Sequence, residues 1–267
     1  MTRHSELSKM ITKVETNEQY HKSSAISASG LKQIFLSSVW HYRRKEYKES
    51  DAMRLGSAIH TVLLEPENFE RQYITQPKFD GRTAEGKAQK AEFEKNAKNK
   101  IILKNEQSEI IHNIQKRFLS DDPIVENCKK YLKGKIELSH YLEYQGVPVR
   151  VRPDCLGEDF ISDIKTFSNS QKSVTVKSFH NEVFFRAYHL QAVFYCDMIG
   201  MDPQDFKFIV IETKPPFTIF PYTMTSEQID KGRNAYQESF EKWNQFLMTG
   251  REDFFDDYLL FDGTFSI

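Results

Sequence analysis

The chain has 267 residues, and its 37 Lys and Arg residues nearly balance its 38 Asp and Glu residues, which leaves a formal net charge of -1 at pH 7. This balance excludes a histone-like polycation, although a local basic groove can still bind nucleic acid. Hydrophobic residues make up 39% of the sequence, which is too apolar for a disordered chain, and no apolar run approaches the roughly 20 residues that span a bilayer. We therefore expect a soluble globular protein with no membrane partner.

The three cysteines, Cys128, Cys155 and Cys196, lie far apart in the sequence and form no CxxC pair. An odd number of scattered cysteines favours free thiols in a reducing compartment, and it argues against a disulfide scaffold or an iron–sulfur cluster. The polar start of the sequence has no apolar segment of the kind found in signal peptides. We therefore predict a cytoplasmic protein.

The first third of the chain is predicted to be helical. Apolar spacing or helix-favouring composition indicates four helices, at residues 31–35 with Ser29 as the N-cap, 52–64, 84–99 and 106–119. The helix at 84–99 is rich in Ala, Lys and Glu, so we expect it to be largely solvated. This part of the chain is expected to be a peripheral scaffold.

The pattern changes to strands after Gly134. Alternation of apolar and polar residues predicts an antiparallel meander of three strands, at residues 136–144, 147–154 and 160–167. The elements that follow are a helix at 184–199, strands at 206–212 and 217–222, and a long helix at 226–248 that Gly250 ends. No repeat or linker divides the chain. These elements predict a single mixed α/β domain over residues 1–267, in which residues 1–26 are a candidate flexible segment.

The two turns of the meander set the register of its strands. If residues 145–146 form a two-residue turn, Glu137 lies opposite Asp154. If residues 158–159 form the next turn, Asp154 lies opposite Asp163. The register therefore predicts two carboxylates side by side on one face of the sheet.

Such a pair of carboxylates can form a metal-binding site. Directly opposed residues in antiparallel strands have Cα atoms about 4.5–5.5 Å apart, so two carboxylates there can bind one cation, and Mg²⁺ or Mn²⁺ suits such ligands. Alternation places Lys165 on the same side as Asp163, where its ammonium can orient an attacking water. The chemistry that fits is phosphodiester hydrolysis. The alternative is that Asp154, Asp163 and Lys165 are solvated residues on the outer face of the sheet, joined by a weak surface ion pair.

Several motifs resemble those of the PD-(D/E)xK nucleases. Pro153-Asp154 followed by Asp163-Ile164-Lys165 is similar to that signature, while GSAIH (56–60) and QAVFY (191–195) resemble the GxxxH and QxxxY motifs of the RecB-like branch. Four longer stretches look like the catalytic domain of RecE-type exonuclease VIII, namely LGSAIHTVLLEPENF (55–69), RVRPDCL (150–156), ISDIKTF (161–167) and HLQAVFYCDMI (189–199). The similarity runs from about residue 27 to the C-terminal helix. It implies a restriction-endonuclease-like core, in which helices flank a central mixed sheet, with a helical N-terminal portion.

The resemblance also implies a metal site. His60, Asp154 and Asp163 would hold a catalytic Mg²⁺ together with the backbone carbonyl of Ile164, and Mn²⁺ is expected to substitute. The cysteines match no iron–sulfur set, so the resemblance favours the cluster-free exonucleases. A lone histidine in an apolar helix is more often a core residue, and this is the alternative for His60. Glu137 is either a supplementary ligand or an outward strand residue.

Three further residues receive catalytic roles from the resemblance. Lys165 would position the nucleophilic water, and Gln191 and Tyr195 would contact the scissile phosphate or hold Lys165. Gln191 and Tyr195 are four residues apart and so share one helix face. The alternative is a core role in an aromatic-rich helix, although a buried glutamine needs hydrogen-bond partners.

Contact with DNA is predicted from local basic residues. Arg43, Arg44 and Lys45 form the densest basic cluster, and Arg150 and Arg152 are predicted to share the face of Asp154. Arginine there can bind phosphates with two hydrogen bonds. The alternative for Arg43, Arg44 and Lys45 is an ordinary solvated helix end.

The resemblance implies a Mg²⁺-dependent exodeoxyribonuclease that degrades linear double-stranded DNA from 5′ to 3′ in phage-type homologous recombination. Its expected partners are double-stranded DNA ends, a single-strand annealing protein of the RecT kind, and further copies of the chain in a ring. Three alternatives stay open: a site-specific endonuclease of the same superfold, a non-catalytic DNA-binding protein that retains the fold, and an unrelated α/β protein with accidental matches.

Overall fold

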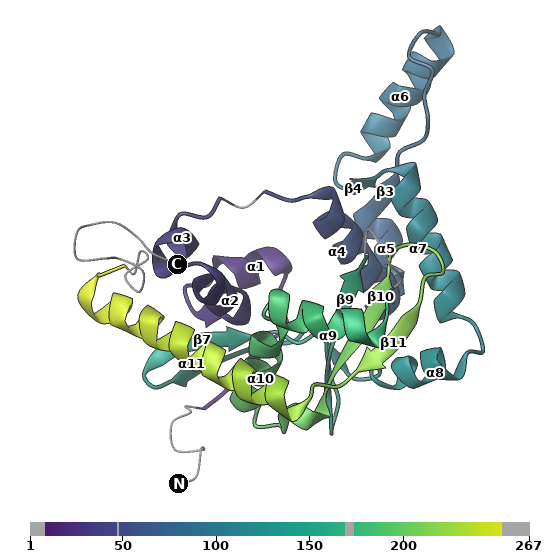
Figure 1. Ribbon diagram of the computed structural model, residues 1–267. Helices are drawn as coiled ribbons and strands as arrows, with labels where there is room; N and C mark the ends of the chain where they lie inside the picture. The colour runs from purple at the N-terminus through teal and green to yellow at the C-terminus, as the bar shows by residue number, and fades with distance from the viewer. Residues whose placement is uncertain (1–8, 47, 169–173, 253–267) are drawn as a thin grey trace, which may run out of the picture.

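The computed structural model describes residues 9–46, 48–168 and 174–252, and its largest sheet has five strands in the order β11-β10-β9-β8-β5 (Figure 1). The strands are β5 (Lys135–Ile136), β8 (Cys155–Leu156), β9 (Ile161–Phe167), β10 (Phe206–Glu212) and β11 (Ile219–Tyr222). β9 and β10 run parallel, and the other neighbouring pairs are antiparallel. The mixed α/β fold with a central mixed sheet is thereby confirmed.

Helices cover both faces of this sheet. On one face, Ile209 and Ile211 of β10 join a core with residues of α4 (Asp51–Leu64), α7 (Asn105–Phe118) and α8 (Pro123–Lys130). On the other face, Phe208 and Val210 join a core with residues of α9 (Val176–Phe185) and α10 (Tyr188–Ile199). Because β10 is buried on both sides, its sequence is almost wholly apolar rather than alternating.

A second sheet contains four strands in the order β1-β6-β7-β2. Its strands are β1 (Ile11–Lys13), β2 (Ile26–Ser27), β6 (Ser139–Tyr144) and β7 (Val147–Val151). One face of this sheet, which includes Val149 and Val151, shares a core with α2 (Ala28–Leu36), α10 and α11 (Ser226–Thr249). Residues 11–27 thus form β1, α1 (Asn17–Lys22) and β2, whereas residues 1–8 of the predicted flexible segment lie outside the described residues.

The predicted register is confirmed in both hairpins, but the strands do not form one meander. Tyr144 pairs with Val147, and Ser162 pairs with Cys155, as the two turns predicted. Glu137 has a left-handed backbone conformation (φ 46°), so the chain bends there and β5 separates from β6 into the other sheet. The bend explains why the predicted strand at 136–144 is two strands.

Four of the predicted helices are confirmed near their expected positions. They are 52–64 as α4, 84–99 as α6 (Ala84–Asn96), 106–119 as α7 and 226–248 as α11, which ends at a left-handed Gly250 (φ 69°). The helix predicted at 31–35 is α2, but its N-cap is Ser27, whose hydroxyl accepts a hydrogen bond from the Gly30 N–H. The helix predicted at 184–199 is wrong as a single helix, because a left-handed Ala187 (φ 49°) separates α9 from α10.

The remaining elements are short. They are α3 (Val39–Arg43), α5 (Pro66–Gln72), β3 (Tyr73–Thr75), β4 (Ile101–Leu103) and a 3₁₀ helix, η2 (Pro203–Asp205). β3 and β4 pair at the base of an arm in which α6 projects away from the rest of the molecule (Figure 1). Most of α6 is exposed, as its composition predicted. In the part of the chain that the structure describes, every helix is too short or too polar to span a bilayer.

The crossing of α10 and α11 provides a test of the packing. A Cβ atom added at Gly232 of α11 would lie 2.5 Å from the backbone oxygen of His189 in α10. We expect Gly232→Ala to lower the free energy of unfolding by about 2 kcal/mol, because the helices must move apart. The measurement is urea unfolding, with Asn234→Ala on the exposed face of the same helix as the control, expected to change stability by less than about 0.5 kcal/mol. Equal effects of the two substitutions would contradict the close packing.

Candidate active site

The predicted residues Asp163, Lys165 and Gln191 meet in one cluster. Asp163 and Lys165 lie two residues apart on β9 and so point to the same side, toward α10. Gln191 Nε2 donates a hydrogen bond to Asp163 Oδ1 (2.6 Å), and Lys165 Nζ donates one to Gln191 Oε1 (3.2 Å). Lys165 also forms an ion pair with Asp163. Gln191 therefore holds the Asp163 carboxylate and the Lys165 ammonium of β9 in a fixed arrangement.

Asp154 joins this cluster from the residue just before β8. Its Oδ2 atom accepts a hydrogen bond from the backbone N–H of Ile164 (2.7 Å) and lies 3.3 Å from His60 Nδ1. Asp154 is thus tied to the strand that carries Asp163, as the register predicted, and α4 brings His60 to the same place. The alternative of a core histidine bonded to a carbonyl does not describe His60, because its ring nitrogen pairs with the Asp154 carboxylate.

The charged groups are largely removed from water. The side chain of Asp163 is 4% exposed, that of Lys165 14%, that of Asp154 15% and that of His60 25%. The alternative of a solvated surface ion pair is therefore wrong. The helices α4 and α10 approach the site from the two faces of the sheet and shield it from solvent.

The two carboxylates differ in their proton affinity. Burial and the neighbouring charge of Asp154 raise the pKa of Asp163 above its usual value. Burial would also raise the pKa of Asp154, but the neighbouring His60 outweighs it and lowers that pKa. Burial likewise works against the charged form of His60, whose pKa Asp154 nevertheless raises. Two carboxylates with separated pKa values in one site are a common feature of catalytic centres.

The donor set fits a hard divalent cation. Two carboxylates and an imidazole lie close together, and the buried Oδ2 atom of Asp163 contacts Lys165 Nζ and has no other partner among the described residues. Within the same residues, no three His, Cys, Asp or Glu side chains stand in a metal-binding arrangement; Asp154 is paired with His60, and Asp163 with Lys165. The roles of His60, Asp154, Asp163 and the Ile164 carbonyl as metal ligands stay predictions.

Tyr195 lies on the same face of α10 as Gln191. The two side chains are hydrogen-bonded, and both residues are less than 8% exposed. Burial, reinforced by the nearby carboxylates, raises the pKa of Tyr195 well above its usual value. The hydroxyl therefore stays protonated and acts as a hydrogen-bonding group that supports Gln191.

Sequence reasoning missed two residues of the site, Lys32 and Tyr188. Lys32 Nζ lies 3.4 Å from Gln191 Oε1, the oxygen that also accepts from Lys165. The Tyr188 ring lies beneath both ammonium groups, 4.7 Å from Lys165 Nζ and 4.9 Å from Lys32 Nζ. Tyr188 could have been found from its position three residues before Gln191 on one helix face. Lys32 carries no signal in the sequence motifs.

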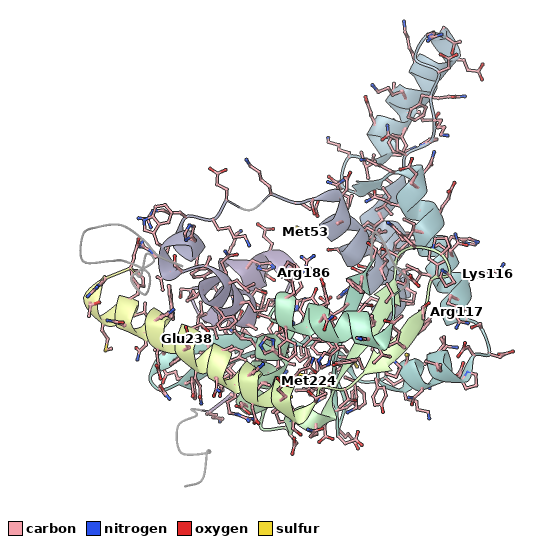
Figure 2. The ribbon with its side chains drawn as sticks, viewed as in Figure 1. Met53, Lys116, Arg117, Arg186, Met224 and Glu238 are labelled. Atoms are coloured by element: carbon pink, nitrogen blue, oxygen red, sulfur yellow. The ribbon has the colours of Figure 1, made fainter. Side chains whose placement is uncertain are left out.

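A cavity of about 810 Å³ adjoins this cluster. Gly56 of α4, Thr166 next to Lys165, and Tyr188 line it. Met53 and Arg186 line it as well, and Figure 2 shows them on α4 and at the end of α9. The cavity thus gives a substrate strand room next to the Tyr188 ring, which lies against Lys165 Nζ.

Arg150 and Arg152 are not available as surface contacts for DNA, contrary to the prediction. The guanidinium of Arg150 is buried against the Tyr20 ring (4.5 Å) and donates hydrogen bonds to the backbone oxygens of Tyr20 and Ser23 (3.0 Å for Ser23) at the end of α1. Alternation does place Arg150 opposite to Val149, but α1 covers that face of the sheet. Arg150 therefore fixes α1 to β7.

Arg152 and Glu137 bind each other. Arg152 Nη2 lies 2.6 Å from a carboxylate oxygen of Glu137, and Arg152 Nε donates to the Glu137 backbone oxygen (3.0 Å). The Glu137 N–H donates to the backbone oxygen of Asp154 (3.1 Å), which confirms the register. Glu137 is therefore a structural partner at the bend rather than an outward residue, and its role as a supplementary ligand stays a prediction.

The basic cluster at the C-terminal end of α3 is partly exposed. Arg43 and Arg44 both form ion pairs with Glu252, and their side chains are 45% and 50% exposed. Lys45 Nζ donates to Gln33 Oε1 (2.9 Å). Their contact with DNA stays a prediction.

The burial of Arg150 can be tested. We expect Arg150→Met to lower the free energy of unfolding by about 2 kcal/mol, because two backbone oxygens lose their charged donor. Arg44→Met is the matched control, expected to cost less than about 1 kcal/mol because its ion pair is half exposed. Urea unfolding measures both. A small effect of Arg150→Met, similar to that of Arg44→Met, would show that Arg150 is a surface residue after all.

Comparisons with known proteins show the family and the fold of the chain. A family model described as "PDDEXK-like domain of unknown function (DUF3799)" matches residues 27–253. The chain is also similar in fold to the crystal structure of a protein from Eubacterium rectale described as a "Putative exonuclease", with a TM-score of 0.61, 15% identity, and 90% of each chain covered. A search of curated proteins found no match.

Proposed function

We propose that this chain, which belongs to the family of PDDEXK-like domains, is a metal-dependent nuclease that hydrolyses phosphodiester bonds of DNA. The observation that carries the proposal is the convergence of Asp154, Asp163 and Lys165 at one buried site. These three residues come from the stretches that resemble the PD-(D/E)xK signature. A buried pair of carboxylates beside an ammonium has a plain use in phosphodiester hydrolysis and contributes little to stability.

The residues that would hold Mg²⁺ are His60, Asp154 and Asp163, with the backbone carbonyl of Ile164. The metal, with Mn²⁺ as a substitute, would act as a Lewis acid on the phosphate and lower the pKa of a bound water. Lys165, held by Gln191, can donate a hydrogen bond to the attacking water and orient it.

The finer proposal is an exodeoxyribonuclease of the RecE type. It would act from 5′ to 3′ on linear double-stranded DNA in phage-type recombination, leave a single strand for a RecT-like annealing protein, and assemble as a ring. Two observations support the exonuclease part. Four stretches of the sequence resemble that class, and the fold neighbour from Eubacterium rectale bears an exonuclease description.

Substitutions at the site test the catalytic assignment. We expect Asp163→Asn and Lys165→Met each to lower the rate of DNA digestion in Mg²⁺ by at least about a hundredfold, because each removes a charge that acts on the reacting groups. The assay is digestion of linear duplex DNA. Asp121→Asn, at an exposed position before α8, is the control and is expected to keep full activity. If folded Asp163→Asn or Lys165→Met protein digests DNA at the parental rate, the assignment is wrong.

The choice of substrate tests the finer proposal. We expect matched linear duplexes to be degraded in Mg²⁺ while covalently closed circles stay intact, with a 5′ label released before a 3′ label, and EDTA to stop the reaction. Cutting of closed circles at defined sites would instead identify an endonuclease. Binding of DNA without cutting, over a titration with Mg²⁺ and Mn²⁺, would identify a non-catalytic DNA-binding protein.

A further inference from the structure

Lys32 occupies an unusual position on α2. It follows Ala28 by four residues, so it shares the helix face that buries Ala28 against the core. Its neighbour Leu31 is also fully buried. A lysine directed toward the protein interior costs free energy unless a partner stabilises its charge.

The contacts of Lys32 repeat those of the predicted catalytic lysine. Lys32 and Lys165 both donate to Gln191 Oε1, at 3.4 and 3.2 Å, and both ammonium groups lie over the Tyr188 ring. Because they contact the same oxygen and the same ring, the two ammonium groups are neighbours. The side-chain oxygen of Gln191 thus accepts hydrogen bonds from two lysines, and its side-chain nitrogen donates one to Asp163.

Charge is not balanced between these two lysines. Lys165 forms an ion pair with Asp163, whereas Lys32 forms none among the described residues. Burial, and then the neighbouring charge of Lys165, lowers the pKa of Lys32 to about 7. An anion that approached Lys32 would therefore supply the counter-charge that the protein itself does not provide.

We propose that Lys32 binds a phosphate of the substrate strand next to the scissile phosphate. This inference rests on the proposed nuclease function and names a substrate-binding residue of that site. Tyr188 links both Lys32 and Lys165 to the cavity, because its ring contacts both ammonium groups and also lines that cavity. A strand that lies in the cavity and reaches Lys165 then has its neighbouring phosphate within reach of Lys32.

The test is the salt dependence of DNA binding. A fluorescein-labelled linear duplex is titrated with the full-length protein in EDTA, so that no cleavage occurs, at a series of salt concentrations. Lys32→Met keeps an apolar chain over Tyr188 but removes the charge, and we expect about tenfold weaker binding with a salt slope about 0.7–0.9 smaller, as for loss of one phosphate contact. Lys116→Met, on α7 away from the site (Figure 2), is expected to keep the parental slope.

Further variants separate substrate binding from a structural role. We expect Lys32→Arg to restore most of the salt slope, and we expect Lys32→Met to raise KM in Mg²⁺ while kcat changes only a few fold. Lys32→Gln provides a second neutral variant should Lys32→Met fold poorly. A parental slope in the neutral variants, or a large fall in kcat at unchanged KM, would overturn the inference and show that Lys32 only holds Gln191. Absence of both binding and cleavage by the unaltered protein would instead overturn the proposed nuclease function.

Discussion

The structure depends on the close approach of Asp154 and Asp163 in a largely buried position. Two neighbouring carboxylates repel each other, and burial adds a desolvation cost to each of them. The protein offsets this with one cationic partner for each carboxylate, His60 for Asp154 and Lys165 for Asp163. Gln191 and the Ile164 N–H then fix the carboxylate oxygens by donating a hydrogen bond to each carboxylate. An arrangement this costly persists only where the surrounding fold determines it.

The bend between the two sheets makes that arrangement possible. Up to Cys155 and Ser162 the strands pair by regular ladder bonds, but Asp154 lies one step beyond the paired residues. Its side chain, not its backbone, therefore reaches the N–H of Ile164. The contacts between Glu137 and Arg152 hold the chain at the bend. A continuous meander would have left Asp154 as an ordinary strand residue.

The register of the carboxylates could be predicted from the sequence because it depends only on local turns. Two-residue turns set which residues face each other, and alternation sets the side of Lys165. What could not be predicted depends on distant segments or on weak signals. An alanine does not indicate a left-handed backbone conformation, so nothing in the sequence predicted the helix break at Ala187. The burial of Arg150 could not be predicted without knowing that α1 packs over β7. Alternation alone placed Arg150 on an exposed face of its strand.

The first third of the chain is part of the site, not the peripheral scaffold that its composition suggested. α4 brings His60 to Asp154, and α2 brings Lys32 to Gln191. Asp163 lies on β9 and Asp154 just before β8, whereas Lys32 comes from a helix packed against α10 and α11. Asp163 and Lys165 both face α10 and pair with each other, so the cation that Lys32 adds there, without an ion-pair partner among the described residues, favours approach of phosphate from that side. The N-terminal helices therefore contribute to the direction from which a DNA strand would enter, and the central sheet contributes the groups that would act on it.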